Sequence, residues 1–395
     1  MAIGDLLHQT PVTTPDPYTG CPVTRLTPPD HTSHHMYFYN RMVTSDSSRL
    51  LYCAEINGRR NLYLMELATG DAVQLTEGDA LDDYGAMISA DDKSVYYQQD
   101  RKVWKLDLAT LQRTCLYAAP DGWDCGNWGM SDDNRYLVMT ETRRDTLPDL
   151  TGKKGWEFFP LTCAAKPLCH IVYLDTQTGE HHIVVEDRCW FGHAQLRPGD
   201  PDTILFCHEG PYDMIDARLW LIQSDGSRYR CARPQPKDVI ITHEFWMPTG
   251  DRLAYVYRKA DDGSTETIRM MRPETLEEEL FMPCLPYAHF ICDRQRRWFV
   301  GDCQGQETPI HLQTGEGRGQ EVRNDFIYLV DIARKKEIPL CYHGTSWTTI
   351  HGTPQDAHPH PCFTPDGSGV VFTSDREGKP CVYLAKTAGA AAKGK

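Results

Sequence analysis

The stretch SDSSRLLYC at positions 45–53 joins a polar turn to a run of apolar and aromatic residues. A second apolar run, NLYLMEL at positions 61–67, follows it and ends near an acidic residue. The pair recurs as SADDKSVYY at positions 89–97 and VWKLDL at positions 103–108. Runs that are rich in β-branched and aromatic residues and bounded by turn residues predict paired antiparallel strands.

The unit is repeated along the whole chain. Counted from the turn, seven copies begin at positions 45, 90, 131, 198, 248, 292 and 365. Most intervals lie near the roughly 40–50 residues that one four-stranded propeller blade occupies. The sequence therefore predicts an all-β, seven-bladed β-propeller with four-stranded blades, as a single domain over positions 1–395, although the length alone would also suit two domains.

Three segments stand apart from the repeat. The two long intervals contain insertions at positions 143–165 and 304–323, and the second, rich in Gly and Gln, is expected to form a loop. VTRLT at positions 23–27 resembles VQLT at positions 73–76 and predicts an N-terminal strand that completes the last blade and closes the ring. The tail at positions 388–395 is expected to be disordered.

Composition excludes several classes of protein. The net charge of −14 argues against nonspecific nucleic-acid binding, but not against a small anionic substrate. No apolar run reaches the roughly 18 residues of a membrane span, and positions 1–11 lack the pattern of a signal peptide. The 15 cysteines are scattered and odd in number, which favours reduced thiols in a cytoplasmic protein.

A cluster of candidate metal ligands precedes the last turn, in QDAHPHP at positions 355–361. His358 and His360 are two apart in a predicted strand, so their side chains should share a face, and Gln355 adds an amide oxygen. A solvated histidine pair is the simpler alternative. The rest of the chain favours a site, because other histidines occupy related positions.

Histidines precede the turns of the three preceding copies as well. His193, His243 and His360 each lie five residues before a turn proline, His358 lies seven before, and His289 lies three before Cys292. Because these offsets are all odd, alternation along a strand predicts that the side chains share one face. The first three copies have Asn40, Gly85 and Gly126 at the matching positions. The pattern predicts a channel site on blades four to seven.

The predicted ligands are His289, Gln355, His358 and His360. Three imidazoles and one amide oxygen suit a catalytic Mn, Fe, Ni or Zn ion that keeps open coordination positions. Because the set has no cysteine or carboxylate, a closed structural zinc site is disfavoured.

Further residues are candidates for catalysis and substrate binding. His243 is a candidate general base, since the unperturbed pKa of a histidine side chain lies near neutrality. Arg218 is a fixed cation suited to a carboxylate, with a surface ion pair as the alternative. His193 and His208 are candidate substrate contacts. The chain has no Gly-x-Ser-x-Gly elbow and no phosphate loop, which argues against a serine hydrolase or a nucleotide enzyme.

The sequence resembles the bacterial oligogalacturonate lyases of pectin degradation. The resemblance runs over nearly the whole chain and is most specific in THEFW at positions 242–246 and in QDAHPHP. It implies a manganese ion on His289, Gln355, His358 and His360, with His243 as the base and Arg218 neutralising the substrate carboxylate. The implied reaction is β-elimination on short oligogalacturonides, giving 4,5-unsaturated products. The insertions at positions 151–166 and 304–323 carry no visible family motif, which leaves the length of the substrate open.

Two other functions remain open from the residues alone. A propeller can be a binding module without catalysis, and its metal content would distinguish it from an enzyme. The same scaffold could also carry a metal-dependent hydrolase or isomerase acting on another sugar acid. The absorbance of the product separates elimination from both alternatives.

Overall fold

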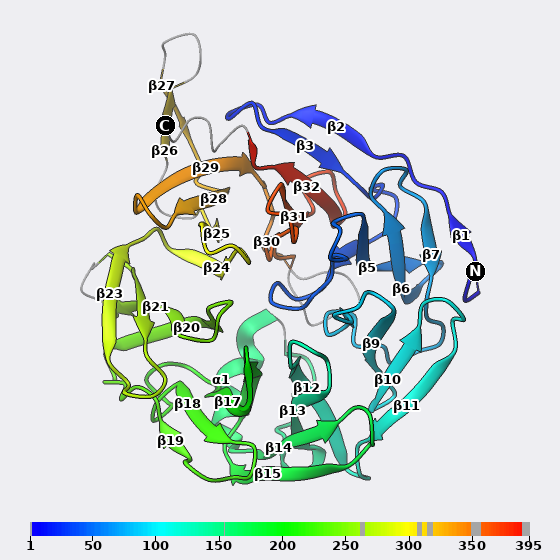
Figure 1. The fold of residues 1–395 in the computed structure, drawn as a ribbon. Coiled ribbons are helices and arrows are strands. Elements are labelled where there is room, and N and C mark those ends of the chain that lie inside the picture. Colours follow the sequence, from blue (N-terminus) through cyan, green and yellow to red (C-terminus); the bar gives the residue numbers. More distant parts are fainter. Residues whose placement is uncertain are drawn as a thin grey trace. The chain divides into compact units, whose positions relative to one another are not determined.

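The computed structural model describes residues 2–153, 155–260, 265–305, 310–313, 319–348 and 357–388. These residues form seven antiparallel sheets of four or five strands and one separate two-stranded hairpin. Five of these sheets are meanders in sequence order, one of them interrupted by the hairpin, and the other two also include strands from positions 6–25 (Figure 1). This is the topology of a seven-bladed β-propeller, and the predicted fold class is confirmed.

The polar turns of the repeat are hydrogen-bonded motifs that join the first two strands of a sheet. Ser89 donates its hydroxyl to Asp91 at 2.6 Å, and the same carboxylate accepts the Lys93 backbone N–H at 3.2 Å. Equivalent hydroxyl–carboxylate bonds of 2.6 Å join Thr44 to Asp46, Ser131 to Asp133 and Thr364 to Asp366. A short polar side chain that bonds to the local backbone stabilises a turn, which explains the Ser or Thr and the Asp in these four turns.

The chain divides into two compact units. Unit 1 is Met1–Ile88 with Leu285–Lys395, and unit 2 is Ser89–Cys284. The prediction of a single domain over positions 1–395 stays a prediction.

Unit 1 contains three sheets of four or five strands and the hairpin. The first has the order β1 (Leu6–Leu7), β7 (Ala72–Gln74), β6 (Arg59–Glu66), β5 (Arg49–Ile56), β4 (Ser33–His35). The second is β24 (Tyr287–Cys292), β25 (Trp298–Cys303), β28 (Phe326–Asp331), β29 (Lys336–Tyr342). The third is β2 (Val12–Pro15), β3 (Pro22–Arg25), β32 (Cys381–Lys386), β31 (Gly369–Ser374), β30 (Cys362–Phe363). The hairpin is β26 (Ile310–Gln313) with β27 (Gly319–Val322).

The two ends of the chain share the last of these sheets. Strand β3 pairs with β32, with Val23 opposite Ala385 and Arg25 opposite Tyr383, and Figure 1 shows the blue and red strands side by side. The predicted N-terminal strand in the last blade is confirmed. Strands β1 and β2 each add a fifth strand to a sheet, which the four-stranded prediction did not include.

Four further sheets, each of four strands, use β8 to β23. The first is β11 (Arg113–Ala118), β10 (Lys102–Asp107), β9 (Ser94–Gln99), β8 (Met87–Ile88). The second is β12 (Trp123–Met130), β13 (Tyr136–Arg143), β14 (Leu168–Asp175), β15 (His181–Arg188). The third is β16 (Phe191–Arg197), β17 (Asp200–His208), β18 (Leu219–Gln223), β19 (Arg230–Cys231). The fourth is β20 (Val239–Trp246), β21 (Leu253–Lys259), β22 (Thr267–Met271), β23 (Glu278–Pro283).

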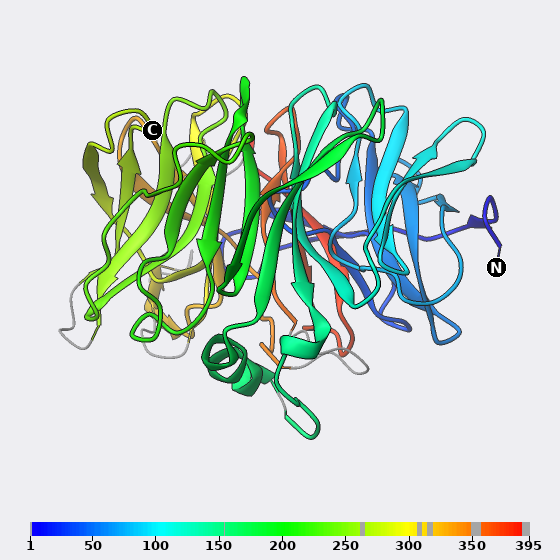
Figure 2. The same cartoon turned by 90° about the horizontal axis from the view of Figure 1, so that it is seen from below.

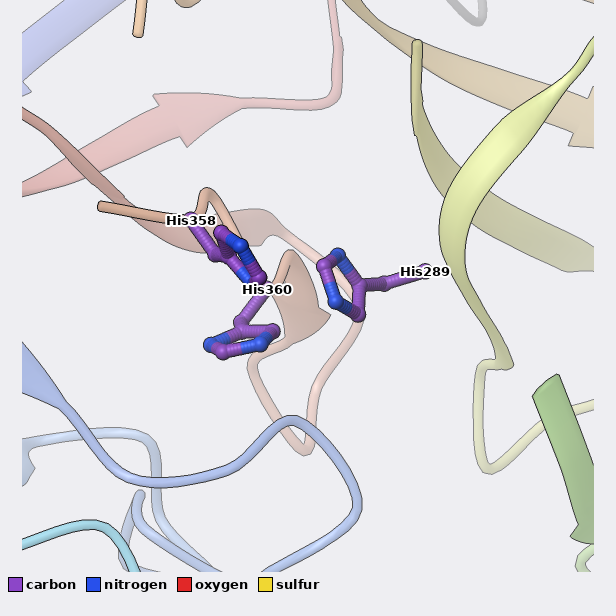
Figure 3. A group of neighbouring side chains, drawn as sticks. All are labelled: His289, His358 and His360. Atoms are coloured by element: carbon purple, nitrogen blue, oxygen red, sulfur yellow. The ribbon is translucent and has the colours of Figure 1, made fainter. Parts of the chain in front are cut away.

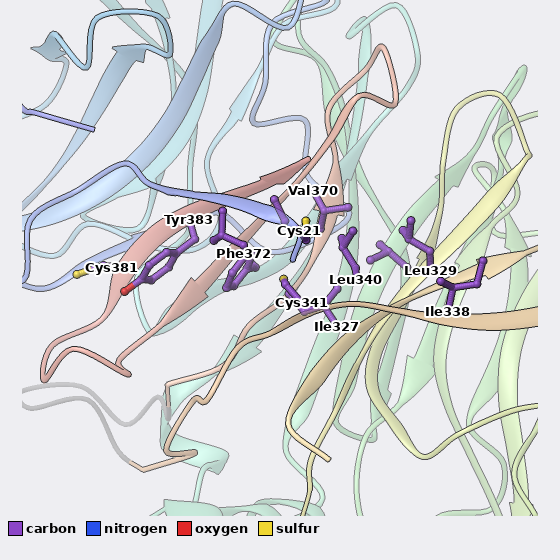
Figure 4. Packing of buried hydrophobic residues seen from close by; sticks show 13 residues of the cluster. Cys21, Ile327, Leu329, Ile338, Leu340, Cys341, Val370, Phe372, Cys381 and Tyr383 are labelled. Carbon is purple, nitrogen blue, oxygen red and sulfur yellow. The ribbon is translucent and has the colours of Figure 1, made fainter. Parts of the chain in front are cut away.

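The core of unit 1 lies between neighbouring sheets. Val300 of β25, Leu329 of β28 and Phe372 of β31 are fully buried in one cluster, and Val23 of β3 joins them. Figure 4 shows side chains of this cluster between the strands. Middle strands such as β28 and β31 are buried on both faces, and each therefore contains a run of apolar residues in the sequence.

The insertions contain structure of their own. Positions 143–165 include η1 (Arg144–Thr146), η2 (Gly155–Glu157) and α1 (Phe158–Ala165), and Figure 2 shows α1 beyond the ends of the green strands of unit 2. Positions 304–323 include the hairpin of β26 and β27, where a loop was expected. Positions 389–395, most of the predicted tail, lie outside the described residues. In the described part of the chain, no helix has the length and hydropathy that a bilayer crossing requires.

Candidate functional site

Three of the four predicted metal ligands lie together. The imidazoles of His289, His358 and His360 are buried, and one nitrogen of each lies within 4.8 Å of the others (Figure 3). Their ring centroids are separated by 4.1 Å for His289 and His360 and by 5.1 Å for each of the other two pairs. Gln355, the fourth predicted ligand, lies outside the described residues. Its role stays a prediction.

Local backbone structure holds the two C-terminal histidines in place. They precede β30, and the carbonyl of Pro359 between them accepts the Thr373 backbone N–H at 3.0 Å. The same carbonyl lies 3.0 Å from Nε2 of His35. His360 has a φ of 46°, a left-handed conformation that is uncommon outside glycine and often marks functional positions.

The third histidine is oriented by a buried carboxylate. Asp302 of β25 is fully buried and accepts both the backbone N–H of His289, at 2.6 Å, and its Nδ1–H, at 2.9 Å. A histidine that donates Nδ1–H has its lone pair on Nε2, the atom that can bind a metal. Burial raises the pKa of Asp302 to about 6, although the neighbouring His343 and the His289 N–H act in the opposite direction.

The environment keeps the imidazole of His360 neutral. Burial lowers the pKa of His360 well below its usual value, and the nearby His289 and His358 lower it further. The neutral imidazole is the form that binds metals, because protonation occupies the lone pair.

These residues fit a divalent ion. Three convergent nitrogen donors suit the borderline transition metals that the sequence predicted. Two other groups also bring ligand atoms within 4.8 Å: His34 with Cys53 and Asp83, and His193 with Cys207 and Glu209. In both of these, an arginine already pairs with the carboxylate, Arg60 with Asp83 at 3.4 Å and Arg218 with Glu209 at 3.2 Å, which disfavours a further cation.

His243 and His193 occupy equivalent β-bulges in unit 2. In β20 the register shifts between Thr242 and Phe245, and in β16 it shifts between Gly192 and Gln195. His243 has a φ of 57° and His193 a φ of 50°. A bulge adds a residue to one strand and re-aims its side chain, so the alternation assumed for the sequence is interrupted at these histidines.

Arg218 is not a surface residue. Its guanidinium forms a two-pronged ion pair with Glu244, with Nε–Oε2 at 2.7 Å and Nη2–Oε1 at 3.0 Å, and Nη1 reaches Glu209 at 3.2 Å. Arg218 is only 9% exposed. The alternative prediction of a surface ion pair is wrong, because Arg218 and both of its partners are buried.

The two histidines predicted as substrate contacts have different surroundings. His193 Nε2 lies 3.0 Å from Oε1 of Glu209. His208 is buried, stacks on Trp220 with centroids 4.5 Å apart, and contacts Asp216 and Tyr229 through its two nitrogens. Such packing is typical of a structural imidazole. Substrate contact by either residue stays a prediction.

Three carboxylates of these sites had no role in the sequence analysis: Glu209, Glu244 and Asp302. Glu209 and Glu244 each follow a histidine in the sequence, which is a usable signal. Asp302 has no such signal, because only the pairing of β24 with β25 brings it opposite His289.

The fold and the three buried histidines define the class of the protein: a β-propeller with a candidate metal centre. A sequence model described as oligogalacturonate lyase matches residues 1–391. The chain therefore belongs to the oligogalacturonate lyase family, as its motifs predicted.

Individual relatives agree over the full length. The oligogalacturonide lyase of Pectobacterium atrosepticum is 38% identical over 389 residues, which are 98% of either chain, and the oligogalacturonate lyase of Dickeya dadantii is 38% identical over 391 residues, again 98% of either chain. A solved oligogalacturonate lyase in complex with manganese superposes with a TM-score of 0.88 at 37% identity, covering 98% of both chains. The oligogalacturonate lyase of Vibrio parahaemolyticus gives 0.88 at 36% identity, covering 98% of this chain and 99% of its own.

Proposed function

We propose that this protein is a metal-dependent lyase that cleaves short oligogalacturonides by β-elimination, with manganese as the metal. The observation that carries the proposal is the group of His289, His358 and His360, whose nitrogens lie within 4.8 Å of one another. It occurs in a chain that is 38% identical over 98% of its length to an oligogalacturonide lyase. The relative solved with manganese supports the choice of metal.

The metal would be held by these three imidazoles, with Gln355 as the proposed fourth ligand. A divalent ion bound there supplies a Lewis acid for the negative charge that develops on a uronate carboxylate.

The proposed chemical steps belong to two residues of unit 2. His243 takes the proton from C5 of the uronate, and the electron pair of that C–H bond forms the C4–C5 double bond as the C4–O bond breaks. The C4 oxygen leaves with the other sugar, so the product is a 4,5-unsaturated uronate. Arg218 donates to the uronate carboxylate while negative charge grows there.

The test is an ultraviolet absorbance assay on digalacturonate with and without a chelator, together with elemental analysis of the purified protein. We expect a conjugated product that is lost with chelator and restored by Mn²⁺. His243→Ala should abolish the product and leave the bound metal in place. His8→Ala is the matched control, since the His8 side chain is 74% exposed.

Other outcomes would support the alternatives. A protein without metal and without product would be a binding module, and cleavage without conjugated product would indicate a hydrolase. Turnover by His243→Ala would remove His243 from the mechanism.

We also propose a cytoplasmic location. All 15 cysteines lie in described segments, and the described residues contain no disulfide, which is the usual state in a reducing compartment. The proposed partner is a short acidic oligosaccharide rather than a nucleic acid, in keeping with the net charge of −14.

A further inference from the structure

We infer that Glu244 and Glu209 are positioning residues that fix the guanidinium of Arg218 for the carboxylate of the substrate. The inference rests on the proposed role of Arg218. It concerns two carboxylates that do not themselves take part in the proposed chemical steps.

The geometry around Glu244 fixes the plane of the guanidinium. Its two oxygens accept Nε–H at 2.7 Å and Nη2–H at 3.0 Å from Arg218. A two-pronged bond to a planar fork restrains both the position and the rotation of the group, which a single bond does not do. Burial alone would raise the pKa of Glu244, but the charge of Arg218 keeps it below its usual value, so the pair is ionised.

Glu209 holds the guanidinium from a second direction. Its Oε2 accepts Nη1–H of Arg218 at 3.2 Å, while its Oε1 lies 3.0 Å from His193 Nε2 and 3.1 Å from Cys207 Sγ. The carboxylate is thus held by three side chains. We assign His193 to this support of Glu209.

The close packing of Glu209 depends on a glycine. A Cβ at Gly192 would lie 2.6 Å from both Cγ and Oε1 of Glu209. Real Cβ atoms do not approach other atoms so closely, so any larger residue at position 192 would displace the carboxylate.

The backbone around the cluster is held as well. Gln235 accepts the backbone N–H of Arg218 at 3.0 Å and donates to the carbonyl of Val239 at 3.0 Å. Gln195 donates to the carbonyl of Glu244 at 3.1 Å. Gln195 of β16 and Gln235 in the segment before β20 therefore fix the backbone of both partners of the ion pair.

This arrangement leaves part of Arg218 available. A guanidinium has five N–H groups, and the contacts among the described residues use three of them. Glu209 and Glu244 carry two negative charges against the one positive charge of Arg218, so the group as a whole does not attract the substrate carboxylate before reaction. The fixed direction of the remaining N–H groups matters most when negative charge grows on that carboxylate.

Loss of positioning should therefore lower kcat more than it changes KM. For Glu244→Gln we expect kcat to fall by about 10- to 100-fold, with KM within about threefold, since misplacement of a catalytic group by about 1 Å can cost about 100-fold. Glu244→Asp keeps the charge but is too short for the same two bonds, and it should lose kcat similarly. Rates are measured on digalacturonate with Mn²⁺, and melting temperatures report folding.

A double-variant cycle separates positioning from a general loss of structure. If Glu244 acts through Arg218, then Arg218→Lys with Glu244→Gln should have the kcat of Arg218→Lys alone. Glu278→Gln is the matched control, because Glu278 also binds two arginines, Arg233 and Arg269, in the same unit. It should retain the wild-type kcat. If Glu244→Gln does not fold, Glu209→Gln is measured in the same way.

The outcomes distinguish this inference from the proposed function. The inference is overturned if Glu244→Gln keeps its kcat within twofold of the wild type. It is also overturned if the fold-decrease in kcat of the double variant equals the fold-decreases of the two single variants multiplied together. When Arg218→Lys loses activity and Glu244→Gln does not, the proposed role of Arg218 stands and this inference fails. Absence of any unsaturated product from the wild-type protein would overturn the proposed function itself.

Discussion

In the candidate site, the orientation of two functional side chains is restricted because part of each side chain is bonded to a carboxylate. Asp302 occupies Nδ1 of His289, so Nε2 is the atom that carries the lone pair. Glu244 occupies one edge of the Arg218 guanidinium. In both cases a carboxylate acts on a functional group by restricting its orientation.

The Asp302→Asn variant tests this restriction at the metal centre. Asparagine cannot act as a charged acceptor for Nδ1–H, so His289 loses its fixed tautomer and ring orientation. We expect the dissociation constant for Mn²⁺ to rise about 10- to 100-fold, the usual effect of removing such a partner. Isothermal titration of the metal-free protein with Mn²⁺ measures it.

The fold should survive this substitution. Because burial raises the pKa of Asp302 to about 6, a charge at this position is unfavourable in the metal-free protein, and a neutral side chain of the same shape is tolerated. Asp225→Asn, in an exposed turn, is the control and should bind Mn²⁺ as the wild type does. An unchanged affinity in Asp302→Asn would mean that the carboxylate does not orient the ligand.

At the scale of strands, the sheets combine two kinds of element. Middle strands such as β28 and β31 are buried along their whole length and hold the core. First strands such as β16, β20 and β24 contain register shifts next to the candidate site residues. Buried middle strands thus provide stability, while the bulges in the first strands orient the histidines.

Because β28 is buried along its length, truncating one of its side chains should strongly destabilise the protein. Leu329 is fully buried in the core of unit 1, so Leu329→Ala should reduce the free energy of unfolding by about 2–5 kcal/mol. Leu280 of β23 is 53% exposed, and Leu280→Ala should change the free energy of unfolding by less than about 0.5 kcal/mol. Urea unfolding of both variants tests this difference. Equal losses in the free energy of unfolding would contradict the prediction.

Buried neutral histidines connect the stability of the whole molecule to pH. Burial lowers the pKa of His343 to about 4, despite the opposing influence of Asp302 and of the Cys303 carbonyl. Its Nε2 lies 2.9 Å from that carbonyl, and its Nδ1 accepts the Thr345 N–H at 3.1 Å. A proton on Nδ1 would face this N–H, so the folded protein resists protonation.

The sign of the effect follows from the two pKa values. The pKa of His343 is about 4 in the folded protein, below the roughly 6.5 of an unfolded chain. Its contribution to stability is therefore complete above about pH 6.5 and is lost as the pH falls towards 4. Between pH 7 and pH 5 the loss from this residue is about 2 kcal/mol.

The prediction is measured by urea unfolding of the metal-free protein at both pH values. His343→Gln keeps a donor and an acceptor but does not titrate, so it should lose about 2 kcal/mol less than the wild type between pH 7 and pH 5. An identical loss in the two proteins would show that His343 is protonated in the folded state at pH 5.

Much of the architecture was predictable because it depends on local patterns. The turns that begin with Ser or Thr and Asp form through bonds between residues two apart, so their positions and number are visible in the chain itself. Buried middle strands such as β28 and β31 are also visible in the sequence, because each contains consecutive apolar residues. The likeness of positions 23–27 to an outer strand was enough to place β3 in the last sheet.

The site was predictable only in part. His358 and His360 are two apart, and His289 also lies an odd number of residues before its own turn, so the sequence alone indicated that these three belong together. The fifth strands β1 and β2 were not predicted, because short strands with exposed faces have no apolar pattern. The hairpin of β26 and β27 lies where a composition rich in Gly and Gln predicts a loop, because glycine is a poor strand former.

Sequence by itself determined the repeat, the class of fold, the family and the types of residue at the site, because each of these depends on local order along the chain. Tertiary structure alone decided which carboxylate binds which functional group. Asp302 reaches His289 across a strand pair, and Glu244 reaches Arg218 from another sheet, over 26 residues of chain. Such partners are selected by sheet pairing and by bulges, which act through space and have no fixed spacing in the sequence.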